Sequence, residues 1–123
     1  MSSIAIACQV VIALGIFNVW IVRRNRPTAY RPEGARDIQD EFRRYGLPSW
    51  MWVAVGSAKI VLAAALLVGI FVPSVAPAAA GLLALLMVAA VGAHVKVRDP
   101  LVKSVPALLM LLLSTVVLVT YSA

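Results

Sequence analysis

The chain has 123 residues, of which 63% are hydrophobic and only 13% are charged, and its mean hydropathy is +0.97. Globular domains are about 45–50% apolar and about 25% charged, and a small soluble fold cannot remove so much apolar surface from water. The length excludes a multidomain protein. We therefore expect a single integral membrane domain spanning residues 1–123.

Positive charge is concentrated in two stretches that lie between apolar segments. Seven of the eleven Lys and Arg residues fall between positions 23 and 44, and three more are Lys96, Arg98 and Lys103. This pattern is typical of cytoplasmic loops that follow the positive-inside rule. It also argues against nucleic acid as a partner, although the net charge is +6.

The predicted fold is all-α, a bundle of four transmembrane helices. About 20 apolar residues cross a ~30 Å hydrocarbon core as a helix. The charge rule places both basic loops in the cytoplasm and both termini outside, in a multi-pass protein of the cell membrane. The four segments of this length are residues 3–22, 50–72, 77–96 and 102–122.

The first basic loop contains a short predicted helix over residues 33–45. Ile38, Phe42 and Tyr45 are spaced to share one face of it, and Gly46 is a suitable residue to end it. We expect an amphipathic interfacial helix between the first and second spans.

Two placements of this helix are compatible with its pattern. Its apolar face can lie on the membrane surface, with its arginines toward anionic lipid headgroups. Alternatively, it can fold back over the mouth of the bundle as a lid. In either placement Asp40 and Arg44 have the spacing of an i,i+4 ion pair.

Lys59 lies near the middle of the second span, where a charge costs about 2.5–3.5 kcal/mol on the insertion scale. It is ~13 Å along the helix from Trp50 at 1.5 Å per residue, and a lysine stem that snorkels covers about half of that length. A partner or a water-filled pocket explains Lys59 better than snorkelling does.

Other residues indicate where this pocket lies. Trp52 and Gly56 share the helix face of Lys59, and Asn18 and His94 bring polar groups to a similar depth. A lone histidine at a helix end is as often an interface residue as a ligand. The acidic residues able to pair with Lys59 are Asp37, Asp40, Glu41 and Asp99, and we favour Glu41 because it borders the inward face of the loop helix.

Two further patterns concern packing. Gln9 lies on the opposite helix face from Asn18, and we expect it to make a packing hydrogen bond. Small residues one turn apart in the third span predict close approach of helix backbones. These residues are Ala76, Ala80, Ala84, Ala89 and Ala93, with Gly81 and Gly92 beside them.

Several short motifs together resemble the DoxX-like family of small four-helix membrane proteins. The wider family is similar to the membrane subunit of thiosulfate:quinone oxidoreductase, so the resemblance implies electron transfer through a quinone. The motifs are Asn18-x-Trp20, Thr28-x-Tyr30-Arg31, Glu41-Phe42-x-x-Tyr45-Gly46-Leu47-Pro48, Gly56-x-x-Lys59 and His94-x-Lys96-x-x-Asp99-Pro100.

Three functions follow as hypotheses. The first is binding of a lipophilic ligand such as a quinone in a polar pocket, as a redox-linked membrane subunit. The second is a membrane-embedded acid–base enzyme, an isomerase or hydrolase, and the third is a structural anchor for a soluble partner. The candidate catalytic residues are Lys59, His94 and Glu41, and the candidate ligand-binding residues are Asn18, Trp52, Gly56, Tyr45 and Asp99.

We expect neither an intrinsic cofactor nor a metal site. One histidine and one cysteine cannot supply the ligands of a bis-His haem or an iron–sulfur cluster. Electrons can then pass only through a bound quinone or through the cofactor of a soluble redox partner. Other expected partners are the lipid bilayer, its anionic headgroups and a second copy of the chain.

Overall fold

A computed structural model describes residues 3–23, 25, 30–32 and 34–122, and every regular element in that part of the chain is helical. Four helical segments are long and apolar enough to cross a membrane, which confirms the predicted fold class. The first is α1 (Ser3–Phe17), which continues as the π-helix η1 (Asn18–Val22). The others are α3 (Ser49–Phe71), α4 (Ala76–Lys96), which follows the short helix η2 (Pro73–Val75), and α5 (Val105–Ser122), which follows η3 (Leu101–Ser104).

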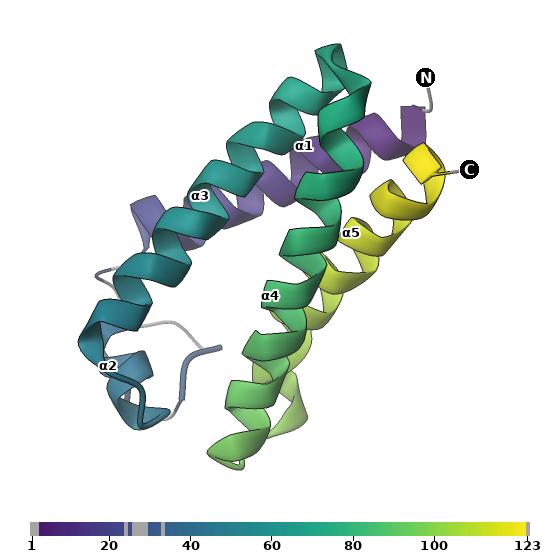
Figure 1. The fold of residues 1–123 in the computed structure, drawn as a ribbon. Coiled ribbons are helices and arrows are strands. Elements are labelled where there is room, and N and C mark those ends of the chain that lie inside the picture. Colours follow the sequence, from purple (N-terminus) through teal and green to yellow (C-terminus); the bar gives the residue numbers. More distant parts are fainter. Residues whose placement is uncertain (1–2, 24, 26–29, 33, 123) are drawn as a thin grey trace.

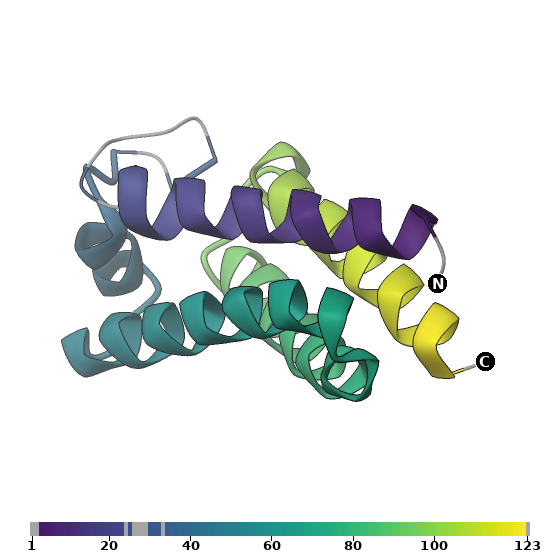
Figure 2. The same ribbon diagram turned by 90° about the horizontal axis from the view of Figure 1, so that it is seen from above.

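The four long helices form a bundle with two distinct ends. The helix pairs α4–α5, α1–α3, α3–α4 and α1–α5 are in contact. Both chain termini lie at one end, together with the link from α3 to α4 (Figures 1 and 2). The short helix α2 (Ile38–Arg44) lies at the other end. Of the nine basic residues in the described part of the chain, all except Lys59 belong to the segments at this α2 end.

The interior of the bundle is apolar and tightly packed. Ile12, Leu66, Leu83 and Val117 each have no exposed surface and come from four different helices. Large apolar side chains also cover the outside of every long helix, as expected where lipid replaces water.

Gln9 makes the predicted packing hydrogen bonds near the termini. Its Nε2 donates to the carbonyl of Leu66 at 2.8 Å, and its Oε1 accepts from the hydroxyl of Tyr121 at 2.9 Å. The side chain is fully buried, and it links α1, α3 and α5.

The small-residue stripe on α4 packs closely only in its first half. Ala76 and Ala80 are fully buried, and a Cβ placed on Gly69 would lie 3.0 Å from that of Ala76. In the second half, Ala89 is exposed, and a Cβ on Gly92 would meet nothing within 4 Å. Ala93 still packs against the core, so within this half the predicted close packing fails at Ala89 and Gly92 only.

The loop helix exists but is shorter than the predicted 33–45. It begins at Ile38, because Asp37 is its N-cap and accepts a hydrogen bond from the backbone of Asp40 at 2.8 Å. It ends as predicted at Gly46, whose φ of 76° suits glycine. The predicted start, Glu33, lies outside the described residues.

The apolar face of α2 is buried by the bundle. Ile38, Phe42 and Tyr45 are 1%, 8% and 5% exposed and belong to the main hydrophobic core. This contact is the arrangement expected for a helix that folds back over the bundle. The position of α2 at a membrane surface stays a prediction.

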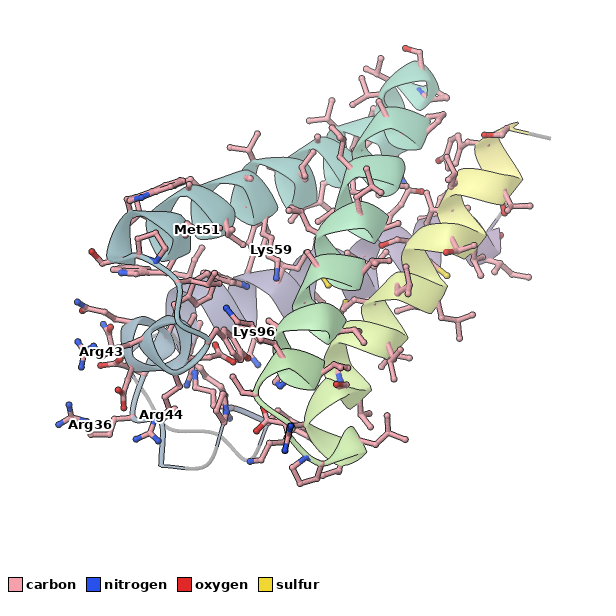
Figure 3. The ribbon with its side chains drawn as sticks, turned by 60° about the horizontal axis from the view of Figure 1, so that its bottom comes forward. Arg36, Arg43, Arg44, Met51, Lys59 and Lys96 are labelled. Atoms are coloured by element: carbon pink, nitrogen blue, oxygen red, sulfur yellow. The ribbon has the colours of Figure 1, made fainter. Side chains whose placement is uncertain are left out.

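The polar face of α2 is held together by Asp40. Its carboxylate lies 3.7–3.8 Å from the guanidinium nitrogens of Arg36, Arg43 and Arg44, so the predicted pair with Arg44 is confirmed. The backbone N–H of Arg36 also donates to Asp40. This hydrogen bond, with the three positive charges, holds the pKa of Asp40 below its usual value against the opposing effect of burial. The three arginines point outward around α2 (Figure 3).

Candidate functional site

A chain of hydrogen-bonded polar side chains links α2 to the end of α4. The hydroxyl of Tyr45 donates to Glu41 Oε1 at 2.9 Å and lies 3.4 Å from His94 Nε2. The other ring nitrogen of His94, Nδ1, lies 2.7 Å from Asp99 Oδ2. We call Glu41, Tyr45, His94 and Asp99 the polar chain. It joins two segments that lie far apart in the sequence, residues 41–45 and 94–99, in one continuous contact.

The backbone at the end of α4 brings His94 and Asp99 together. The N–H of Asp99 donates to the carbonyl of His94, and the N–H of Arg98 donates to that of Val95, both at 3.0 Å. These two bonds form a Schellman motif, which turns the chain back on the last helical turn. The Asp99 side chain therefore faces His94, and both side chains are only 8% exposed.

Arg31 adds a positive charge to the Glu41 end of the polar chain. Its Nε lies 3.8 Å from Glu41 Oε2, and its Nη2 donates to the carbonyl of Arg23 at 3.0 Å. Within the described part of the chain, Nε and Nη1 have no hydrogen-bond partner. Burial lowers the pKa of this guanidinium, against the opposing charge of Glu41.

Burial also changes the acid strength of Glu41 and Tyr45. Desolvation raises the pKa of Glu41, although the Tyr45 hydrogen bond and the positive charge of Arg31 act in the other direction. The pKa of Tyr45 is raised by burial first and by the negative charge of Glu41 second. Glu41 is thus a carboxyl group that keeps its proton to higher pH than an exposed glutamate does.

Lys59 lies on the inner side of α3 and contacts an aromatic ring. It is 7% exposed, its side chain points into the bundle (Figure 3), and its Nζ lies 5.0 Å from the ring centroid of Trp20. A cation–π contact of this kind contributes about 0.5–2 kcal/mol, more when the cation is desolvated. Gly56 makes room for the indole, because a Cβ there would lie 2.6 Å from Trp20 Cε3.

A series of aromatic ring contacts connects Lys59 to the polar chain. The centroids of Trp20 and Phe42 are 6.1 Å apart, those of Phe42 and Tyr45 are 5.9 Å apart, and those of Tyr45 and His94 are 5.6 Å apart. All three contacts are edge-to-face. Each contributes about 0.5–1.5 kcal/mol beyond its buried area, so this aromatic chain fixes α2 against α1 and α4.

The structure corrects two of the sequence predictions about this site. Lys59 and Glu41 do not form the expected ion pair, because Glu41 faces Arg31 and Tyr45 while Lys59 faces Trp20. Asn18 is exposed, because Gln9, on the opposite helix face, points into the core.

The other predicted site residues fall into two groups, those in the polar chain and those around Trp20 or the hydrophobic core. Tyr45, His94, Asp99 and Glu41 are in direct contact, as described above. Gly56 and Lys59 contact Trp20 instead. Trp52 is half-buried beside the hydrophobic core.

Trp20 and Arg31 are site residues that the sequence reasoning did not select. Trp20 is 7% exposed and Arg31 is 3% exposed. Both stand in motifs that carry the family resemblance, and this was the available signal. The spacing of apolar residues along a regular helix could not predict their burial, because Trp20 lies in a π-helix and Arg31 in an irregular connection.

No cluster of three or more His, Cys, Asp or Glu side chains that could hold a metal ion occurs among the described residues. The site instead holds acid–base groups, hydrogen-bond donors and a buried cation. Together with four helices that are long and apolar enough to cross a membrane, these features indicate a multi-pass integral membrane protein.

The comparison with known sequences places this protein in a family. The DoxX-like family profile matches residues 28–117, and the chain belongs to that family. No curated protein and no solved structure matches it significantly.

Proposed function

We propose that the protein binds a lipophilic carbonyl compound of the quinone type next to Lys59, and that the polar chain exchanges protons with the bound molecule. The observation that carries this proposal is the juxtaposition of two groups. One is a buried lysine with no carboxylate of a described residue within 4 Å of it. The other is a buried chain of four titratable side chains.

The residues fit the chemistry of a quinone. When bound, a quinone accepts electrons and protons at its two carbonyl oxygens. The Lys59 ammonium is a positively charged donor in a surrounding of low dielectric constant, where its attraction to a carbonyl oxygen is stronger than in water. The Tyr45 hydroxyl and His94 Nε2 are further buried polar groups, and edge-to-face contacts through Phe42 connect their rings to Trp20 beside Lys59.

The polar chain is able to move a proton between its ends. When Glu41 is ionised, Tyr45 donates to it and accepts from a protonated His94. When Glu41 is protonated, it donates to Tyr45, which donates to a neutral His94. Asp99 accepts from Nδ1 in both states and stabilises the imidazolium in the first. Transfer of one proton along the chain therefore reverses two hydrogen bonds and moves no heavy atom far.

Electrons must come from outside the described groups, and we infer a soluble redox partner or a second lipophilic molecule as the source. The same polar chain would also serve an acid–base enzyme acting on an apolar carbonyl compound. The raised pKa of Glu41 supports this second function, since it brings the carboxyl group closer to neutral pH. The two functions differ in whether the ligand is a quinone.

Binding of a short-chain quinone to the purified protein in detergent micelles tests the proposal. Loss of a hydrogen bond from a charged donor costs about 1.5–3 kcal/mol, which is roughly ten- to a hundredfold in affinity. We expect this loss for Lys59→Met and a comparable one for His94→Ala. The matched controls Lys96→Met and Val95→Ala change exposed side chains and should bind as the wild type does.

The outcomes separate the hypotheses. If both site variants bind quinone with wild-type affinity, the proposal is wrong and a structural anchor is favoured. If the wild type binds a redox-inactive cyclic ketone as tightly as the quinone, the acid–base enzyme is favoured.

A further inference from the structure

A depression lies at the α2 end of the bundle, and neither Lys59 nor His94 lines it. It is formed where the turn after α4 passes the connection that precedes α2. The residues that line it are Pro32, Arg44, Val97, Arg98, Asp99 and Pro100.

Among the described residues that line this depression, the charged side chains that face solvent are those of Arg44 and Arg98. The Asp99 carboxylate is turned inward to His94, so its side chain is only 8% exposed. Arg98 is exposed, and no carboxylate of a described residue lies within 4 Å of its guanidinium. The Arg44 side chain is 44% exposed, although it also approaches Asp40. Its Nη2 is held by the carbonyl of Gly34 at 3.2 Å.

The backbone at Arg98 is unusual for a residue with a side chain. Its φ of 58° is the only positive value among the described non-glycine residues. Arg98 occupies the position of the Schellman motif where helices usually carry glycine, as α2 does at Gly46. An arginine held in a conformation that favours glycine is a strained position of the kind that clusters at ligand-binding sites.

Exposed apolar side chains lie close in sequence to the residues that line the depression. Leu101 is 76% exposed and Val102 is 58% exposed, both in η3, and Val95 on the last turn of α4 is 68% exposed. A basic depression beside exposed aliphatic side chains combines the two features that a phospholipid-binding site needs. One feature attracts a phosphate group, and the other contacts acyl chains.

We infer that the depression binds the phosphate headgroup of an anionic phospholipid from the surrounding bilayer. Arg98 and Arg44 contact the phosphate oxygens, and the acyl chains pass along η3 and the adjoining end of α4. Arginine suits this role because its planar guanidinium matches the oxygens of a phosphate group. The depression shares Asp99 with the polar chain, but the proposed phosphate contacts come from Arg98 and Arg44, which have no part in the proposed function.

Native mass spectrometry of the detergent-solubilised protein tests this site by measuring how much added phosphatidylglycerol stays bound, with phosphatidylcholine as the zwitterionic comparison. The first variant is Arg98→Gly, which removes the guanidinium and suits the positive φ. It should fold at least as stably as the wild type and retain about tenfold less phosphatidylglycerol. The second variant, Arg44→Gln with Arg98→Gly, should retain less still.

The control is the double variant Arg36→Gln with Arg43→Gln. It removes two exposed arginines that also neighbour Asp40 but do not line the depression. We expect its lipid retention to match that of the wild type. Equal loss in this control would mean diffuse surface charge, and unchanged retention in Arg98→Gly would overturn the site. Displacement of the lipid by millimolar inorganic phosphate would show that the site takes free phosphate instead.

Discussion

Tyr45 donates a 2.9 Å hydrogen bond to Glu41, one turn earlier on the same short helix. Both side chains face the bundle, so the acid and the phenol share a desolvated environment. Burial consequently raises the pKa of Glu41 in the folded protein, and folding stability becomes sensitive to the protonation of this one carboxyl group.

The first prediction concerns the pH dependence of stability. Because the folded-state pKa of Glu41 is raised, its contribution is fully present below the unfolded value of about 4.3 and is lost as pH rises through the folded value. In Glu41→Gln this loss should disappear, so the variant should gain stability relative to the wild type over that window. Thermal unfolding in detergent between pH 4 and 8, about the working range of the assay, measures the difference.

Asp40 provides the internal comparison for this experiment. Its pKa is lowered, so its contribution is present above the unfolded value and is lost as pH falls. Asp40→Asn has no such contribution to lose, so its stability relative to the wild type should rise as pH falls. The relative stability of Glu41→Gln should instead rise as pH increases. A wild type and a Glu41→Gln variant with parallel profiles would contradict the assignment for Glu41.

The second prediction concerns the close approach of α3 to Trp20. A Cβ on Gly56 would lie 2.6 Å from Cε3 and 2.7 Å from Cζ3 of the indole. Gly56→Ala should therefore destabilise the fold by about 1–3 kcal/mol, the usual cost of overpacking. It should also move the indole away from Lys59, with a shift in tryptophan fluorescence.

The matched control is Gly92→Ala on α4. A Cβ there meets nothing within 4 Å, and alanine is the better helix former by about 0.8–1 kcal/mol. The control should be neutral or stabilising in the same unfolding assay. Equal destabilisation by both substitutions would show that the indole contact is not the cause.

The third prediction concerns the buried amide near the termini. Gln9→Leu removes the hydrogen bonds with Leu66 and Tyr121, and Tyr121→Phe removes only the second. In membrane bundles such bonds contribute about 0.6 kcal/mol on average, up to about 1.7. A double-mutant cycle on Gln9 and Tyr121 should give a coupling of this size. Strictly additive effects would rule out an energetic link between the two side chains.

Much of the architecture was readable from the sequence because it depends on local composition. A run of about 20 apolar residues forms a helix in lipid wherever it stands, since the backbone polar groups have no other partners there. The four spans accordingly agree with their predicted bounds to within one residue, except that α5 begins at Val105, three residues later than predicted, after the short helix η3. The stop at Gly46 was equally local, because one residue supplies the positive φ.

Only part of the candidate site could be predicted from the sequence. The polar residues His94 and Asp99 could be singled out by their positions near the end of the third span, and Glu41 and Tyr45 by the pattern of the loop helix. Their partners could not, because partner choice depends on how α2 docks against the bundle. Trp20 occupies the place next to Lys59 that the sequence reasoning gave to Glu41.

The sequence by itself thus determined the class of protein, its four spans and the asymmetry of its charge, all of which follow from hydropathy and composition along the chain. Only the tertiary structure decided that α2 packs on the bundle end, that Lys59 meets an indole, and that Arg98 takes a glycine conformation beside an inward-facing Asp99. These features depend on contacts between residues far apart in the sequence and on one backbone angle, and neither leaves a periodic signal.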